Sequence, residues 1–307
     1  MNLKKIATSL LAGLLAVTCV LPLTSCSNSA ASSDTTTAAQ QGNNENSDDE
    51  VVNTGEVKVK VLKMGRALAA VIRTETATVV IDTGDEEHAT DVATYLAEKG
   101  ITTVDALILT NYSKKCIGGV PQLLKSGITV KAVYGGTYAK DSNAYTLFSN
   151  AMASYKLTTT TVGAQQTLTF GDVSLTLYPP TKNYSTLNDE NDEGNSMAVV
   201  AAYGSNKMLF TSRVAGDRMG ELTTQLSGVD VDCLVVPNFG AYDDNLAGLL
   251  SAVKAEYAVI VASTSNPPAD LTLSALTTAG IATENTFVTR DGSIEISADG
   301  TTFSIKQ

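Results

Sequence analysis

Residues 104–119 read VDALILTNYSKKCIGG, and this stretch decides the fold of the chain. Residues 104–110 form an apolar run, which is typical of a strand that is covered on both faces. Residues 111–116 are mostly polar, and residues 118–125 have the pattern of a short helix. The stretch therefore predicts a buried strand, then a polar loop, then a helix, the sequence of elements found in a layered α/β domain.

The rest of the chain supports the same fold class on both sides of this stretch. Apolar residues that recur at helical spacing alternate with short runs that have the strand pattern, and both kinds occur in each half. We expect helices at 86–99, 118–125, 143–155, 217–226, 246–253 and 272–279. Strands are expected at 57–62, 67–73, 78–81, 104–110, 130–134, 158–162, 166–170, 173–178, 197–203, 207–211, 231–236, 257–261, 286–288, 293–297 and 302–305.

The N-terminus has the features of a bacterial lipoprotein signal. Lys4 and Lys5 precede an uncharged apolar stretch that runs to residue 21, and Leu23-Thr24-Ser25-Cys26 follows. The apolar stretch is too short to be read first as a membrane-spanning helix. We therefore predict cleavage before Cys26 and lipidation of its thiol, which anchors the chain in the membrane. The alternative is an ordinary secretory signal that happens to contain a cysteine.

Composition divides the chain into three parts. Residues 1–25 are the predicted signal peptide. Residues 26–53 consist of the lipidated Cys26 and a polar segment with almost no large apolar residue, which we expect to be a disordered tether. Residues 54–307 are long enough for one large domain with its own core. The predicted location is outside the cytoplasmic membrane, on the cell surface or the periplasmic face.

Charge and cysteine content exclude some functions. The net charge is −11; loss of Lys4 and Lys5 lowers it to −13, and the five acidic residues of the tether leave −8 for the domain. Binding to a phosphate backbone needs clustered Lys and Arg, and the linear sequence shows no such cluster, so nucleic acid is an unlikely partner. Of the four cysteines, Cys19 leaves with the signal and Cys116 and Cys233 remain in the domain. Two distant cysteines do not define a disulfide framework.

A series of short motifs, in this order, resembles the metallo-β-lactamase fold, and more narrowly the soluble domain of ComEC-type competence proteins and its stand-alone relatives. The resemblance covers residues 57–303 and implies a four-layer αββα sandwich of the α/β class. The motifs are Val80-Ile81-Asp82-Thr83-Gly84, the run that ends in Leu109-Thr110, Ile117-Gly118-Gly119-Val120, Gly194-Asn195-Ser196, Leu209-Phe210-Thr211, Val235-Val236-Pro237 and Asp291-Gly292-Ser293-Ile294.

The resemblance also implies a site that binds two metal ions, usually zinc, which activate a water molecule for hydrolysis. In this chain the positions that match the family's ligands carry other residues, and the chain contains one histidine, His88. The replaced positions are Asn111, Ser113, Lys115, Cys116, Arg213, Asn238 and Pro267.

Two of these replacements, Lys115 and Arg213, are cations, which would repel a divalent metal. We therefore expect no bound metal and no metal-dependent hydrolysis. Asp82 and Gly84 are retained, and we expect them to structure their loop, with the Asp82 carboxylate accepting backbone N–H groups.

The replaced positions allow other interpretations. Cys116 could act as a nucleophile if Lys114 and Lys115 lower its pKa, or it could simply fill the space of a histidine. Lys115, Arg213, Asn111 and Asn238 could form a pocket for a carboxylate or phosphate. Alternatively, Lys115 and Arg213 could pair internally with Asp82 or Asp243.

Three hypotheses about function follow. The first is a non-catalytic, membrane-anchored domain that binds a small anionic ligand or a protein partner. The second is a hydrolase of phosphodiesterase type with an atypical site, in which Asp82, Asp85, His88 or Cys116 holds one metal. The third is an accessory protein of competence and DNA uptake, against which the negative charge of the domain argues.

Overall fold

The computed structural model describes residues 55–184 and 193–307 of the chain. They belong to one compact unit, Asp48–Gln307. The predicted signal peptide, the predicted lipidation site Cys26 and the predicted tether up to residue 53 lie outside the described residues.

An eight-stranded mixed sheet forms the first half of the domain. Its order is β17-β16-β1-β2-β3-β5-β7-β8, with antiparallel pairing from β17 to β3 and parallel pairing from β3 to β8. The strands are β1 Val57–Val61, β2 Ala70–Arg73, β3 Thr78–Ile81, β5 Ala106–Ile108, β7 Val133–Gly135, β8 Thr159–Thr161, β16 Ile294–Ala298 and β17 Phe303–Lys306; β4 Thr103–Val104 and β6 Thr129–Val130 pair separately.

A seven-stranded sheet in the order β15-β14-β13-β12-β11-β10-β9 forms the second half, and it repeats this plan. Strands β9 to β12 are antiparallel and strands β12 to β15 are parallel. Its strands are β9 Gln166–Phe170, β10 Val173–Tyr178, β11 Ala198–Tyr203, β12 Asn206–Phe210, β13 Cys233–Val235, β14 Tyr257–Ile260 and β15 Thr286–Val288.

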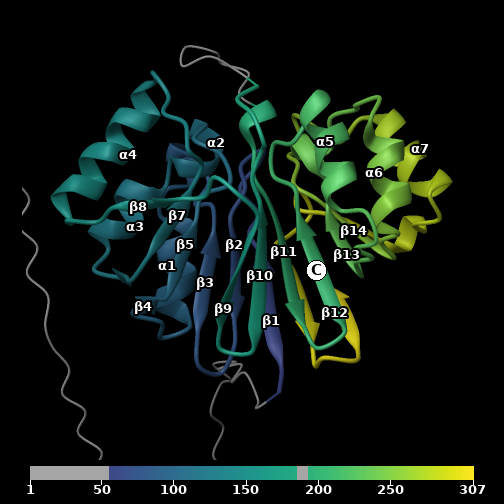
Figure 1. Ribbon diagram of the computed structural model, residues 1–307. Coiled ribbons are helices and arrows are strands. Elements are labelled where there is room, and N and C mark those ends of the chain that lie inside the picture. Colours follow the sequence, from purple (N-terminus) through teal and green to yellow (C-terminus); the bar gives the residue numbers. More distant parts are fainter. Residues whose placement is uncertain (1–54, 185–192) are drawn as a thin grey trace, which may run out of the picture. The chain divides into compact units, whose positions relative to one another are not determined.

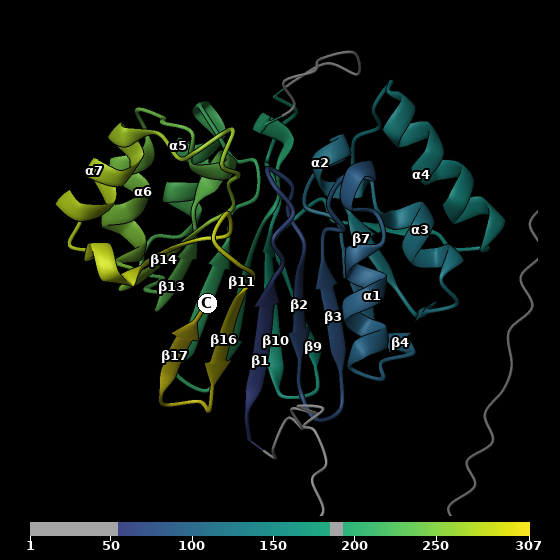
Figure 2. The same cartoon turned by 180° about the vertical axis from the view of Figure 1, so that it is seen from behind.

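Helices cover the outer face of each sheet, as Figures 1 and 2 show from opposite sides. The helices of the first half are α1 Asp91–Glu98, α2 Lys114–Ile117, α3 Val120–Lys125 and α4 Asn143–Ser154, and those of the second half are α5 Asp217–Gln225, α6 Leu246–Val253 and α7 Asp270–Thr278. Short 3-10 helices occur at Glu86–His88, Glu193–Asn195, Pro237–Gly240 and Thr283–Asn285. No helix among the described residues is both long and apolar enough to cross a bilayer.

Three apolar clusters separate these layers. One lies between the two sheets and includes Val59, Ile81 and Phe210; a second joins the first sheet to its helices, and a third joins the second sheet to its helices. The central parallel strands β5 and β13 are buried at every position, because each is covered on both faces. The predicted four-layer αββα sandwich is therefore present.

The structure corrects two predicted elements near the fold-deciding stretch. Residues 104–110 are not one strand, because Asp105 separates β4 from β5; its carboxylate accepts the Thr78 backbone N–H at 2.8 Å and lies 2.7 Å from Lys131 Nζ. The predicted helix at 118–125 is the single helix α3, which begins two residues later, at Val120, and an additional helix, α2, precedes it at Lys114–Ile117. Lys115 and Cys116 therefore lie on a helical turn and not in a loop.

Candidate functional site

The loops that follow the carboxyl ends of β3, β5, β12 and β13 meet above the edge of the two sheets, where ligands commonly bind in α/β proteins. Backbone hydrogen bonds join them in pairs. The Thr83 N–H donates to the Cys116 carbonyl at 2.8 Å, and the Asn238 N–H donates to the Ser212 carbonyl at 2.8 Å. Each bond joins two loops of the same half, and the halves themselves are joined where the Met197 N–H donates to the Thr110 carbonyl at 2.8 Å.

Four residues in these loops have a left-handed backbone, which is unfavourable for residues other than glycine. They are Asp82, Ser212, Asn238 and Phe239, with φ angles of 57°, 50°, 47° and 58°. Such residues persist where the surrounding structure holds them, and they concentrate at functional sites. The loops are therefore held in a specific arrangement.

Asp82 lies at the centre of a buried polar cluster and is itself completely buried. Its Oδ1 accepts the Thr110 backbone N–H at 2.8 Å, and its Oδ2 accepts the Thr110 hydroxyl at 2.5 Å. The Thr110 Oγ1 also lies 2.6 Å from the Ser212 Oγ, which is 3.4 Å from Asp82 Oδ2. The carboxylate thus joins the loop after β3 to those after β5 and β12.

Burial changes the ionisation of Asp82. Loss of solvent raises the pKa of this carboxyl to about 7, even though its hydrogen bonds with Thr110, Cys116 and Ser212 favour the charged form. Near neutral pH the cluster therefore carries at most one negative charge.

Cys116 closes the cluster from the side of helix α2. Its Sγ lies 3.6 Å from the Ser212 Oγ and 3.7 Å from the Ser113 Oγ, and the residue is completely buried. Burial, and then the charge of Asp82, raise the pKa of this thiol well above its usual range. Lys114 is exposed and the Lys115 ammonium group pairs with Asp85, so neither lysine lowers the pKa of this thiol, and burial favours the alternative in which Cys116 fills the space of a histidine.

Asn111 is buried and holds the loop that precedes α2. Its Oδ1 accepts the Ser113 backbone N–H at 2.7 Å, and its Nδ2 donates to the Ser196 hydroxyl at 3.1 Å. Ser113, at the N-cap of α2, is buried too, although it borders a cavity. Asn111 thus lies beneath the surface of the site and does not line the cavity.

Lys115 makes an ion pair with Asp85, which sequence reasoning did not predict. Its Nζ lies 2.7 Å from Asp85 Oδ2, and the other carboxylate oxygen lies 2.8 Å from His88 Nδ1. Burial opposes ionisation of Asp85, but the hydrogen bonds and charges of Lys115 and His88 outweigh it and lower the pKa of this carboxyl. Lys115 is thus paired internally, as the alternative interpretation proposed, but its partner is Asp85 and not Asp82 or Asp243.

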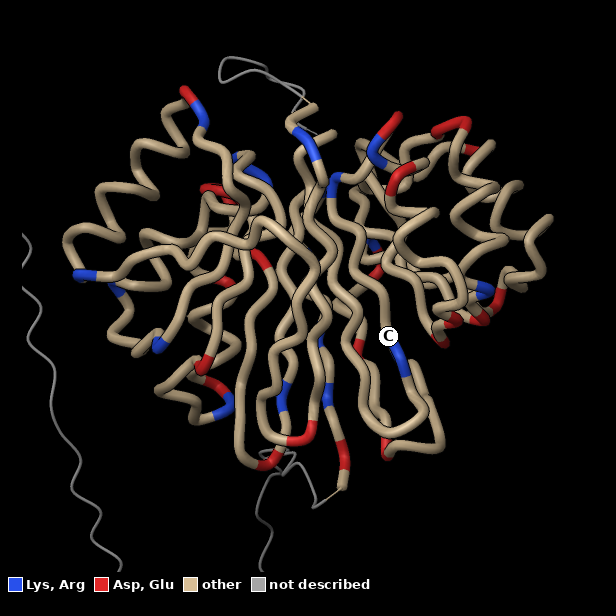
Figure 3. Tube along the Cα trace, in the orientation of Figure 1, with Lys and Arg blue, Asp and Glu red and all other residues tan. Residues whose placement is uncertain are grey.

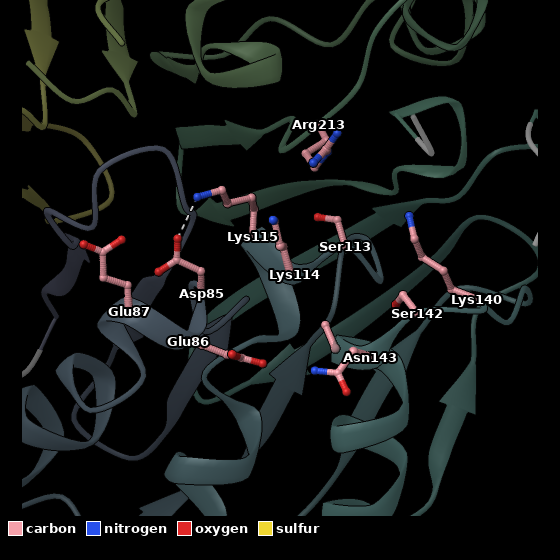
Figure 4. A pocket seen from close by; sticks show the side chains of 11 residues that line it. Asp85, Glu86, Glu87, Ser113, Lys114, Lys115, Lys140, Ser142, Asn143 and Arg213 are labelled. Atoms are coloured by element: carbon pink, nitrogen blue, oxygen red, sulfur yellow. Dashed lines mark hydrogen bonds and ion pairs between the residues drawn. The ribbon is translucent and has the colours of Figure 1, made fainter. Parts of the chain in front are cut away.

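A cavity of about 710 Å³ opens above this cluster. Figure 4 shows Arg213, from the loop after β12, above Ser113 and Lys115 of the α2 region, with Lys140 and Asn143 at the opposite side from Glu86 and Glu87. Four basic residues line it, Lys114, Lys115, Lys140 and Arg213, as do three acidic ones, Asp85, Glu86 and Glu87. Lys115 pairs with Asp85, and the rest of the lining contains three cations, Lys114, Lys140 and Arg213, and two acids, Glu86 and Glu87, so the lining has a small excess of positive charge.

The structure divides the seven predicted positions into three groups. Ser113, Lys115 and Arg213 line the cavity, whereas Asn111 and Cys116 are buried below it. Asn238 is half-buried and holds its loop through the backbone, and Pro267 is exposed. Neither Asn238 nor Pro267 lines this cavity, so the expected pocket contains only part of the predicted set.

The residues present do not fit a pair of zinc ions. Zinc sites are built from imidazole, thiolate and carboxylate ligands, and the buried cluster offers one carboxyl, one protonated thiol and hydroxyls. The hydroxyl groups of Thr110 and Ser212 already contact Asp82 Oδ2, and the ammonium group of Lys115 lies close by at Asp85. A dinuclear site of the family's kind has no ligand set here.

One other group of potential metal ligands occurs among residues 55–184 and 193–307. Asp85, Glu87 and His88 each offer an atom, and these atoms lie within 4.8 Å of one another. However, Lys115 and His88 already contact the two oxygens of Asp85. A metal would have to displace the Lys115 ammonium group.

Sequence reasoning missed Thr110, Ser212 and Lys140 as members of the site. Thr110 and Ser212 are hydroxyl residues at the ends of strands, and nothing in the local sequence marks them as parts of a site. Both contact Asp82, which is distant from them in sequence. Lys140 precedes helix α4 and comes into the cavity only through the packing of that helix. Asp85 carried a signal, since it directly follows the retained motif Asp82-Thr83-Gly84.

Comparisons with known proteins identify the fold. No protein family model and no curated protein matches the chain. Among solved structures, the metallo-β-lactamase fold protein YhfI from Bacillus subtilis superposes with a TM-score of 0.52 at 14% identity, over 77% of this chain and 98% of YhfI. The domain therefore has the metallo-β-lactamase fold.

Two further structures are similar at lower scores. A diphosphatase of the PhnP family matches with a TM-score of 0.47 at 15% identity, over 79% of this chain and 98% of that protein. MEM-A1, a subclass B3 metallo-β-lactamase from a soil metagenome library, matches with a TM-score of 0.41 at 13% identity, over 61% of this chain and 78% of that protein.

Proposed function

We propose that this chain is a lipid-anchored extracytoplasmic protein whose metallo-β-lactamase-fold domain binds a small anionic ligand and does not hydrolyse it. The ligand occupies the 710 Å³ cavity above the position of the family's metals. The anchor at Cys26 and the location outside the cytoplasmic membrane rest on the N-terminal sequence pattern alone.

One observation carries the non-catalytic part of this proposal. The loops that would hold two metals instead enclose the cluster of Asp82, Thr110, Ser212 and Cys116, whose polar atoms contact one another. Such a cluster satisfies its own buried groups and offers no open coordination position. A metal-activated water therefore has no place to form.

The charges around the cavity support an anionic ligand. Arg213 and Lys114 line the cavity from opposite elements, the loop after β12 and helix α2, and both present their charged groups to it. Arginine binds carboxylate and phosphate through a planar fork of donors, which makes it suitable for either.

A relationship to ComEC-type proteins remains part of this proposal and rests on the sequence motifs. The corresponding role, an accessory in DNA uptake, is the weaker alternative, because the domain as a whole carries a charge of −8.

A hydrolase with one metal is the competing function, because Asp85, Glu87 and His88 lie close enough to share an ion. The two functions predict different metal contents. We expect the full-length protein, purified in detergent without chelators, to contain well under one equivalent of zinc, manganese or iron by mass spectrometry. We also expect no hydrolysis of bis(p-nitrophenyl) phosphate above the buffer rate.

Stoichiometric metal together with phosphodiester hydrolysis would overturn the non-catalytic proposal. In that case, substitution His88→Ala would remove both metal and activity.

Ligand binding is tested by calorimetry with glycerol 3-phosphate and with galacturonate as probes. We expect Arg213→Gln to weaken binding of either probe about tenfold, because it removes a charge-assisted hydrogen bond. Lys125→Gln is the matched control, since Lys125 ends helix α3, is exposed and does not line the cavity. Equal binding by both variants would contradict the proposed site.

A further inference from the structure

A second cavity, of about 420 Å³, adjoins the first. The two cavities have three lining residues in common, Asp85, Glu87 and Lys115. The Lys115–Asp85 ion pair thus lies between them, and the second cavity extends from this pair toward Arg66, Arg290 and the loop after β14. Together the cavities form one continuous depression, whose two parts share this ion pair.

Basic residues concentrate along this depression, although the domain as a whole is acidic. Residues 54–307 contain nineteen Lys and Arg and twenty-seven Asp and Glu. Seven of the nineteen cations line the two cavities, against three of the twenty-seven acids. The cations are Lys63, Arg66, Lys114, Lys115, Lys140, Arg213 and Arg290.

These cations come from distant parts of the sequence, so no basic cluster is visible in the sequence itself. Lys63 and Arg66 follow β1, Lys140 precedes α4, Arg213 follows β12 and Arg290 follows β15. Figure 3 shows Lys and Arg segments in the loops at the upper edge, between the two groups of helices. The fold thus creates the basic patch that was missing from the linear sequence.

The cations fall into two groups, one on either side of the ion pair. Lys114, Lys140 and Arg213 line the first cavity, and Lys63, Arg66 and Arg290 line the second. The Arg66 guanidinium lies over the Phe239 ring at 5.6 Å from its centre, and the Arg290 Nε lies 3.3 Å from the Asp291 carboxylate, so a neighbouring group orients each of these two side chains. A single small anion can contact the cations of only one of these groups at a time.

The other lining residues indicate what surrounds the anionic groups of the ligand. None of the residues that line the two cavities, all within the described ranges, is Tyr, Phe or Trp. Bases of single-stranded nucleic acid need such side chains for stacking, so a base-free ligand fits better. Hydroxyl and amide side chains are common instead, and such groups hydrogen-bond to hydroxyl groups. They are Ser113, Ser142, Asn143, Ser263, Thr264, Ser265 and Asn266.

From these observations we infer that the ligand is an extended, hydroxyl-bearing polyanion. It is an oligomer of sugar or polyol units with repeated phosphate or carboxylate groups, and it places one anionic group in each cavity across the Lys115–Asp85 pair. This inference rests on the proposed function and specifies its ligand class.

Binding at two linked positions has a measurable signature. Once an oligomer is long enough to reach both cavities, the second contact is intramolecular and affinity rises without any change in the groups. We therefore expect affinity to increase by tenfold or more at a particular oligomer length, and not in small equal steps. The gain must depend on cations of both cavities.

The experiment uses the detergent-solubilised full chain and two length series, oligogalacturonates for carboxylate and oligo(glycerol phosphate) for phosphate. Affinity is measured by calorimetry for Arg213→Gln, in the first cavity, and for Arg290→Gln, in the second. We expect each variant to lose the length-dependent gain, in at least one series, while Lys125→Gln stays within about twofold of the unchanged protein. The series that shows the gain identifies the anionic group.

Three results would overturn the inference. Monomers that bind as tightly as hexamers, with Arg290→Gln unaltered, would exclude a second binding position while leaving the proposed function intact. An oligodeoxythymidine that binds more tightly than both oligomers of the same charge would assign the depression to nucleic acid. Absence of binding by every anion would refute the proposed function as well.

Discussion

Asp82 makes the stability of the domain dependent on pH, because its carboxyl is buried among hydroxyls without a cation. Its pKa of about 7 in the folded protein lies above the ordinary value of 3.8. The folded state therefore retains a proton that the unfolded chain has released. The stabilisation that the Asp82 proton gives to the folded state is fully present below pH 3.8. It decreases as the pH rises and is lost above about pH 7.

Replacement of Asp82 by asparagine tests this account. Asparagine can accept the Thr110 N–H, tolerates a left-handed backbone and carries no charge at any pH. We expect the free energy of unfolding of the unchanged protein to fall by about 2–3 kcal/mol from pH 5 to pH 8 through Asp82, and Asp82→Asn to remove this part of the fall. Urea denaturation at both pH values measures it.

Asp172→Asn is the control, since it changes an exposed carboxyl on the turn between β9 and β10. If Asp82→Asn and Asp172→Asn show the same dependence on pH, Asp82 is not the source.

At the scale of residues, the sequence indicated which positions lack metal ligands but not which contacts replace them. Asn111, Ser113 and Arg213 could be located by their place between motifs. The contact between Lys115 and Asp85 could not, because the two residues are 30 positions apart and belong to loops whose packing is set by the whole fold. Local sequence carries no information on a pair of this kind.

Among the elements, the turn between helices α2 and α3 depends on two glycines that allow close approach of the β3 loop. A Cβ atom at Gly119 would lie 2.2 Å from the Thr83 carbonyl oxygen, and one at Gly118 would lie 2.7 Å from backbone atoms of Asp85 and Glu86. Backbone atoms cannot move aside as a flexible side chain can. These glycines thus fix the spacing between the loop that carries Asp82 and helix α2, which carries Cys116.

We expect Gly119→Ala to destabilise the domain by about 1–3 kcal/mol, because the added methyl group overpacks the loop. The matched control is Gly248→Ala in helix α6, where the nearest atom to the new methyl is 4.0 Å away. That change should stabilise the protein by about 0.5–1 kcal/mol, since alanine favours a helix over glycine. Thermal denaturation measures whether each variant lowers or raises the stability of the domain. Destabilisation by both variants would contradict the packing argument.

Helices and strands whose apolar residues recur at regular spacing were predicted well. Elements whose bounds depend on contacts between distant residues were not. Helix α6 begins and ends at the predicted residues, because its apolar face and its flanks determine it locally. The break at Asp105 was missed, because it depends on Thr78 and Lys131, whose positions follow from neighbouring strands. Similarly, α2 is only four residues long, below the length at which periodicity is informative.

At the scale of the whole molecule, attachment to the membrane is predicted to depend on a single atom, the sulfur of Cys26. We expect Cys26→Ser to abolish lipidation and to move the chain from the detergent-rich to the aqueous phase in detergent partitioning, because serine lacks the thiol that is acylated. Cys19→Ser is the control, since this residue is expected to leave with the signal peptide. Retention of Cys26→Ser in the detergent phase would refute the anchor.

The pairing of β1 with β16 has a consequence for the time course of folding. Val59 lies opposite Ile296 in the first sheet, so one of the earliest strands of the domain is completed by one of the last. Contacts of such large sequence separation form slowly, because a long loop must close before they contribute any stability. A nascent chain that still lacks β16 and β17 has β1 as an unpaired edge of the first sheet. Under the proposed export, this delay suits a polypeptide that must thread unfolded through a translocation channel and fold on the far side.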